Sequence, residues 1–215
     1  MGSPDGERGR YGDETLHSVT IGRPYYIGVF EVTQRQWELV MGNRPSWFTN
    51  EACYATRPVE EVSYVNVRGD TCGTNWPSLM SVDDDSFLGI FRKKSQFVFV
   101  DLPTEAQWEY ACRAGTDTAL NNGQDIASGA PSGNFDNVGR VGYNGLRDPA
   151  VDDRTAVAYR NLSTSFGTAA VGTYPANHWG LYDMHGNVDE WCLNYYGALP
   201  SDSEVDPEGP STSAD

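Results

Sequence analysis

The chain has 215 residues, and its 30 acidic against 15 basic side chains leave a formal net charge of -15. This surplus repels phosphate groups, which argues against nucleic-acid binding, and no apolar stretch reaches the ~20 residues that a membrane span needs. The length predicts one soluble domain over residues 1–215. The first residues show no secretion-signal layout, so the compartment, cytoplasmic or exported, and the oligomeric state stay open.

The first part of the chain predicts two strands and then a helix. Residues 17–32 are rich in β-branched and aromatic side chains, interrupted by a Gly and Pro turn. A helix is expected over 33–42, because Thr33 can cap it, Gln36 completes a capping box and Gly42 can end it. Its inward residues are expected to be Trp37, Leu39 or Val40, and Met41.

The middle of the chain predicts two further helices separated by a surface excursion. Ser63 is placed to cap the first of them. Residues 72–94 show no sustained period and are expected to form an irregular surface loop, whose acidic triplet is solvated. A strand is then expected from Gln96 until it breaks at Pro103, followed by a helix from the cap Thr104 to Gly115.

Residues 117–170 are rich in Gly, Asn, Asp and Ser and predict irregular loops that need some cross-link other than a strand ladder. The four cysteines, Cys53, Cys72, Cys112 and Cys192, form no CxxC pair and no zinc-finger spacing. Buried thiols are therefore expected, and disulfides only if the protein is exported.

The segment Ala170 to Cys192 has the character of a calcium-binding loop. Calcium takes several oxygen ligands, mixing carboxylates with carbonyls that tight Gly and Asn turns expose. Asp183 and Glu190 supply two carboxylates, and Gly186 and Val188 supply two carbonyls between them. Acidic residues beside Gly and Asn are also common in ordinary turns, so spacing alone favours the site only weakly.

Six blocks of the sequence, in order, resemble the formylglycine-generating enzyme family, also called the sulfatase-modifying factor domain. They are MGSPDGE, YYIGVFEVTQRQW, RPVEEVSYVNV, DLPTEAQWEYACRAGT, VGTYPANHWGLYDMHGN and EWC. Their collinearity covers nearly the whole chain. The resemblance implies an α+β, C-type-lectin-like fold that is low in regular secondary structure, with short helices, small antiparallel sheets and structural calcium.

The resemblance also implies two calcium sites. The first uses Asp183 and Glu190 by side chain and Gly186 and Val188 by carbonyl. The second begins at Asn134 and Phe135, with Asp152 or Asp153 as a later carboxylate. Where the family usually has Trp, this chain has Asp189, which is either a solvent-facing bystander, the favoured reading, or an additional ligand.

Members of the family that oxidise a protein cysteine to formylglycine hold copper with a cysteine pair in a closing segment, and soft thiolates suit Cu(I). The present chain stops before such a segment and begins inside the first family motif, so we expect it to lack the first strand and the catalytic cysteines and to be inactive alone. No catalytic residue is assigned. Copper is expected only if the protein continues into that segment.

Two functions remain open for the chain. One is the family reaction, oxygen-dependent oxidation of a cysteine in a partner protein or peptide. The other is a calcium-stabilised binding or display module without chemistry on the same scaffold. A sulfur-chemistry oxygenase of the ergothioneine-synthase kind would need an iron-binding helical domain that this sequence does not supply.

Overall fold

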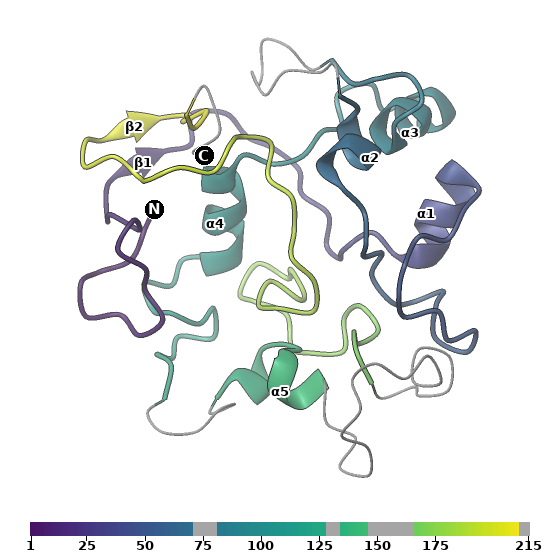
Figure 1. Ribbon diagram of the computed structural model, residues 1–215. Coiled ribbons are helices and arrows are strands. Elements are labelled where there is room, and N and C mark those ends of the chain that lie inside the picture. The colour runs from purple at the N-terminus through teal and green to yellow at the C-terminus, as the bar shows by residue number, and fades with distance from the viewer. Residues whose placement is uncertain (71–80, 128–133, 146–165, 211–215) are drawn as a thin grey trace.

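The computed structural model describes residues 1–70, 81–127, 134–145 and 166–210. Its regular elements are the helices α1 (Gln34–Met41), α2 (Tyr64–Arg68), α3 (Phe87–Ser95), α4 (Glu105–Arg113) and α5 (Gly142–Gly145), the strands β1 (Val19–Thr20) and β2 (Glu204–Val205), and a 3-10 turn at Phe135–Asn137. The helices α1, α2 and α3 gather on one side, α4 lies by the strands, and the late part of the chain runs between them (Figure 1). This confirms a mixed α+β fold with little regular structure.

Helix α1 forms as predicted, because both of its ends are satisfied locally. The Thr33 side chain accepts a hydrogen bond from the Gln36 N–H, the Gln36 side chain accepts one from the Thr33 N–H, and Gly42 ends the helix in the left-handed conformation. Its buried residue Trp37 is only 3% exposed and stacks on Phe87 of α3, with ring centroids 4.7 Å apart. One hydrophobic core therefore lies between α1, α2 and α3.

Helix α4 carries a second core. Thr104 and Gln107 form the predicted capping box, and the helix ends at Arg113, slightly before the expected Gly115. Ala111 and Cys112 are buried against Leu181 and Met184 of the late chain. The expectation that Cys112 packs in the core is confirmed, and the packing fixes the start of the loop that leads to Asp183.

The prediction of an irregular loop over 72–94 is wrong in its second half, where α3 forms. Ser86 caps this helix by accepting a hydrogen bond from the Gly89 N–H, and Phe87 begins it inside the core. Gly89 hid this helix from the sequence pattern, because glycine is unfavourable inside helices. The close packing of the helix against the backbone of Asp83 explains why a glycine stands there. A Cβ there would lie 2.1 Å from the Asp83 carbonyl oxygen, so only glycine fits. Residues 71–80 lie outside the described part of the chain.

Two predicted strands do not form. The carbonyls of Val29 and Val32 accept hydrogen bonds from Tyr182 and Val59, which belong to different segments, so isolated bonds replace a ladder. At 96–100 the backbone curls through short-range hydrogen bonds, and both phenylalanines of this segment are more than half exposed. β-propensity needs a facing strand to be realised, and among the described residues neither segment has one beyond the isolated bridge of Thr33 with Pro58.

The small sheet is parallel, which corrects the expectation of antiparallel sheets. Val19 pairs with Glu204 and Thr20 with Val205, so the first and last described parts of the chain are joined. Asp206 adds to this seam by accepting a hydrogen bond from the Gly22 N–H over 2.8 Å. Among the described residues, no helix is long and apolar enough to cross a membrane.

Candidate binding groove

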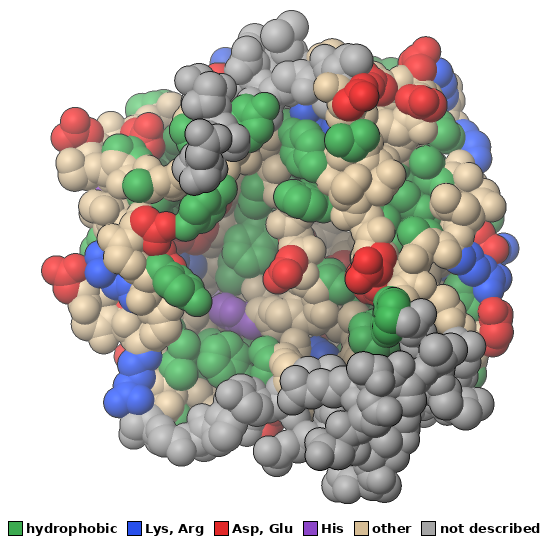
Figure 2. All heavy atoms as spheres, viewed as in Figure 1, with side chains coloured by type: hydrophobic (Ala, Val, Ile, Leu, Met, Phe, Trp, Pro, Cys, Tyr) green, Lys and Arg blue, Asp and Glu red, His purple; other side chains and the backbone are tan. Residues whose placement is uncertain are grey.

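A groove with a volume of about 1130 Å³ opens between the late loop and the wall that precedes α2. It is lined by Phe48, residues 59–63, residues 140–142 with Gly145, residues 167–168 and residues 186–191. On the face shown in Figure 2 the centre is hollowed, and acidic side chains stand beside the hollow. Segments far apart in the sequence thus form one surface.

The late loop owes its shape to three left-handed residues, Asp183, Gly186 and Asn187. Only glycine fits at position 186, where the loop packs closely on the backbone of Arg140. A Cβ there would lie 2.2 Å from the Arg140 carbonyl oxygen. The Asn187 N–H donates to that same carbonyl over 2.7 Å. Its side chain accepts from the Ala169 N–H and donates to Glu31, which pins the loop to two further segments.

The carboxyl groups of Asp183, Glu31 and Glu190 lie close enough together at this loop for their charges to interact. Asp183 is 2% exposed, and its Oδ2 accepts a hydrogen bond from the Gly172 N–H over 2.6 Å. Its Oδ1 is buried without a hydrogen-bond partner, and burial raises the pKa of Asp183. Burial, and then the negative charge of Asp183, raise the pKa of Glu31 to about 8. Glu31 Oε1 is likewise buried without a partner.

Glu190 lines the groove and also lies near the buried carboxyl group of Asp183. Part of the residue is exposed to solvent. Desolvation of its carboxyl group nevertheless raises its pKa, and the charge of Asp183 adds to the rise. The predicted first calcium set therefore lies on one loop, although the Gly186 carbonyl accepts the Val188 N–H over 2.9 Å. In the part of the chain that the structure describes, no three Asp, Glu, His or Cys side chains form a metal cluster.

Sequence reasoning missed Glu31, because it lies in a segment that reads as a strand and far from the acidic loop. Its position two residues before the helix cap Thr33 gave no signal of its contact with Asn187. Only the fold shows that its carboxyl group lies close enough to Asp183 and Glu190 for their charges to act on it.

The residues of the predicted second site have other partners. Asn134 Oδ1 accepts from the Ala127 N–H, and its Nδ2 donates to the Asp125 carbonyl over 2.7 Å. The Phe135 carbonyl accepts two backbone hydrogen bonds, from Val138 and Gly139. Asp152 and Asp153 lie outside the described residues, so the second site stays a prediction.

The wall before α2 presents Glu60 and Glu61 differently. Glu60 accepts the backbone N–H groups of Trp47 and Phe48, which holds that turn in place, and burial raises its pKa. Glu61 is exposed in the left-handed region with φ 60°, an unusual conformation for a residue with a Cβ. Trp191, 49% exposed, donates from its indole nitrogen to the Val62 carbonyl over 3.0 Å.

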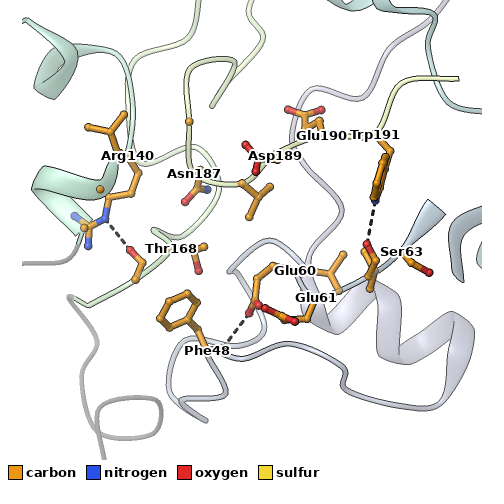
Figure 3. Close-up of a pocket in the computed structure, with 18 residues that line it drawn as sticks. Phe48, Glu60, Glu61, Ser63, Arg140, Thr168, Asn187, Asp189, Glu190 and Trp191 are labelled. Carbon is orange, nitrogen blue, oxygen red and sulfur yellow. Dashed lines mark hydrogen bonds between the residues drawn. The ribbon is translucent and has the colours of Figure 1, made fainter. Parts of the chain in front are cut away.

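The opposite side of the groove carries a cation and a hydroxyl group. Arg140 donates from Nε to the Gly167 carbonyl over 2.9 Å. Next to it, Thr168 is 5% exposed, and its Oγ1 is buried without a hydrogen-bond partner. Figure 3 shows Arg140 and Thr168 on one side of the groove, with Glu61 and Trp191 on the other.

The described cysteines are Cys53, Cys112 and Cys192, all as free thiols. Burial raises the pKa of both Cys112 and Cys192 to about 12, which keeps these two thiols protonated at neutral pH. Copper(I) prefers thiolates, so the burial of these two side chains disfavours copper binding. Cys72 lies outside the described residues.

Comparison with known proteins gives the family. The family model of the sulfatase-modifying factor enzyme 1-like domain matches residues 1–208. The chaperone protein LppX of Paenibacillus barcinonensis is 32% identical over 189 residues, which are 80% of this chain and 62% of that protein. The formylglycine-generating enzyme of Mus musculus is 32% identical over 123 residues, 53% of this chain and 27% of that enzyme.

Both relatives are longer, and the chain spans less than two thirds of either. Among solved structures, Treponema denticola variable protein 1 is similar with a TM-score of 0.63 and 21% identity, over 99% of this chain and 78% of that one. PvdO from Pseudomonas aeruginosa is similar with a TM-score of 0.52 and 23% identity, over 97% and 79%. These likenesses show the fold, and the family match over residues 1–208 shows that this chain belongs to the sulfatase-modifying factor enzyme 1-like family.

Proposed function

We propose that this domain binds an extended polypeptide segment in its groove, on a scaffold whose late loop is held by calcium. The observation that carries the proposal is the groove itself. Its volume of about 1130 Å³ exceeds the ~300–1,000 Å³ typical of small-molecule pockets. Its walls offer an aromatic ring, an unused hydroxyl group and carboxylates, which suits the alternating backbone and side-chain groups of a peptide.

Calcium fits the chemistry of the late loop. A buried carboxylate oxygen without a partner, Asp183 Oδ1, is costly unless a cation or donor satisfies it. The raised pKa values of Asp183 and Glu190 express the same unmet demand for positive charge. Asp183 and Glu190 would hold the ion together with the carbonyls of Gly186 and Val188, and the ion would stiffen the groove wall.

The calcium part is tested by melting the chelator-treated protein with and without millimolar calcium. At a hundredfold excess over Kd, a ligand of the folded state adds ~3 kcal/mol, which raises Tm by roughly 5–10 °C in a domain of this size. Asp183→Asn should reduce the shift, while the exposed Asp202→Asn should preserve it. An unchanged Tm in calcium would refute this part of the proposal.

The binding part is tested by selection from a displayed random-peptide library with the immobilised domain. Gly142→Trp places a large side chain at an exposed position on the groove wall, whereas Ser201→Trp adds the same side chain at an exposed position outside the groove. We expect the wild type and Ser201→Trp to enrich the same peptides and Gly142→Trp to lose them. Equal enrichment by all three proteins, or no enrichment, would contradict binding in the groove.

The family reaction is a second candidate, favoured by the similarity to formylglycine-generating enzymes. It needs copper-binding cysteines, and burial raises the thiol pKa of Cys112 and Cys192, which disfavours the thiolate form that copper(I) prefers. Incubating the full-length protein and copper with a Cys-x-Pro-x-Arg peptide, followed by mass measurement, tests it. Conversion of the cysteine would establish the reaction, and unmodified thiol would count against it.

A further inference from the structure

The seam between β1 and β2 encloses a histidine. His17 lies two residues before β1, and its side chain is fully buried. Its Nε2 lies 3.4 Å from Oε2 of Glu204, the first residue of β2. Figure 1 shows the two strands beside each other near the N-terminus. Neither residue lines the groove. An ionisable ring is therefore buried where the first and last described parts of the chain meet.

The other ring nitrogen of His17 fixes where its protons lie. Nδ1 is 3.0 Å from the Thr15 carbonyl oxygen, which can only accept, so Nδ1 must carry a proton. In the neutral ring this is the only proton, and the buried Nε2 turns a lone pair toward the carboxylate of Glu204. In the imidazolium form Nε2 also carries a proton. The contact with Glu204 is therefore attractive only when the ring is protonated.

We propose that His17 and Glu204 form a proton-dependent latch, which holds the β1–β2 seam closed at mildly acidic pH and loosens it at alkaline pH. Histidine is the side chain whose charge ordinarily changes between about pH 5 and 8. Burial disfavours the imidazolium, and the facing carboxylate favours it. Closure, which brings Glu204 against the ring, and protonation therefore favour each other. A rise in pH then shifts the seam toward its open form.

The other charged groups at the seam belong to the amino end, to α4, to the segment before the ring and to the end of β2: Met1, Glu105, Asp13, Glu14 and Asp206. The amino group of Met1 and the carboxylate of Glu105 line one small cavity together with Glu204. The carboxylates favour the imidazolium, and the amino group opposes it. Among the described residues, Glu204 alone lies within ion-pair distance of the ring, so its carboxylate governs the latch.

Hydrogen exchange of the seam amides tests the latch in the wild-type chain. The N–H groups of Glu204 and Asp206 donate across the seam over 3.0 and 2.9 Å, so their protection from exchange reports closure. Each rate is divided by the intrinsic rate at the same pH, and the Trp108 N–H of α4 serves as the internal reference. Between about pH 5.5 and 8 we expect protection of the seam amides to fall about three- to tenfold relative to that reference. Constant relative protection would overturn the latch.

Glu204→Gln separates the latch from other effects of pH. The side chain is 38% exposed, and glutamine has nearly the same shape, so the variant should fold. Its amide can accept a hydrogen bond from the imidazolium and donate one to Nε2 of the neutral ring. The seam of this variant should therefore be protected equally at both pH values.

Glu208→Gln is the matched control, because it removes the same charge at an exposed position four residues away. It should keep the wild-type dependence on pH. Loss of that dependence in both variants would reduce the effect to overall charge and refute the latch, and so would a full dependence in Glu204→Gln.

Nitrogen-15 chemical shifts of the His17 ring give an independent readout of its protons. We expect protons on both ring nitrogens at about pH 5.5 and on Nδ1 alone at the alkaline end of the series. A neutral ring with its proton on Nε2 could donate to Glu204 without being charged, which would overturn the proposal. A ring that is still neutral at about pH 5.5 would overturn it as well.

Discussion

Replacing Glu31 by Gln should stabilise the calcium-free protein at alkaline pH. Burial and the charge of Asp183 raise the pKa of Glu31 from 4.5 to about 8 in the folded state. Because the folded value lies above the unfolded one, the stability linked to this proton is fully present below pH 4.5 and is lost as the pH rises through 8. Glutamine carries no charge, so the variant avoids this loss.

The size of the effect follows from the two pKa values. Each unit is worth about 1.4 kcal/mol, so the upper limit above pH 8 is about 5 kcal/mol. We expect about 2–3 kcal/mol, because Asp183 and Glu190 can take up part of the proton demand. The amide of glutamine keeps an oxygen that can accept the hydrogen bond from Asn187.

Urea unfolding at a series of pH values, in chelator, measures the difference between wild type and Glu31→Gln. The variant should gain relative to the wild type between pH 5 and 9 and show no gain near pH 4. Glu38→Gln is the matched control, since its hydrogen bonds to Arg35 and Arg44 lower its pKa and its pH trend should have the opposite sign. A variant-to-wild-type difference that is constant with pH would refute the reasoning.

Three further predictions concern the frame of the domain. Trp37→Ala should lower the free energy of unfolding by about 3–5 kcal/mol in urea titrations, whereas Leu39→Ala, at a position 59% exposed, should change it by less than about 0.5 kcal/mol. Thr104→Ala removes the cap of α4 and should cost about 1 kcal/mol by the same measurement. Alkylation at pH 8, mapped by mass, should modify the partly exposed Cys53 well before the buried Cys112, whose thiol pKa is about 12, and equal rates would contradict that burial.

The parts of the fold that the sequence predicted are those with local signals. The capping boxes at Thr33 and Thr104 and the cap at Ser63 each place a side chain within a few residues of the backbone group it satisfies. Helix α3 lacked a complete box and contains Gly89, so its pattern was hidden. The strand expected from Gln96 failed because strand formation depends on a partner far along the chain.

The residues of the candidate site also differ in whether local sequence signals reveal them. The late-loop residues from Asp183 to Glu190 could be predicted as one set because they lie within eight residues of each other in the sequence. Glu61 and Thr168 were not found, because nothing near them in the chain signals that they line one groove. Their shared surface depends on long-range contacts, such as the hydrogen bond from Asn187 to Arg140, which a linear pattern does not contain.

The parallel pairing of β1 with β2 has a consequence for the order in which the molecule assembles. The bond from Gly22 to Asp206 joins positions 184 residues apart, so closing this seam restricts almost the entire chain at once. Contacts of such long range form slowly unless intervening segments are already compact. We therefore expect the helical cores to form first on the folding pathway. The pairing of β1 with β2 should form near its end, and only in molecules whose cores have already packed correctly.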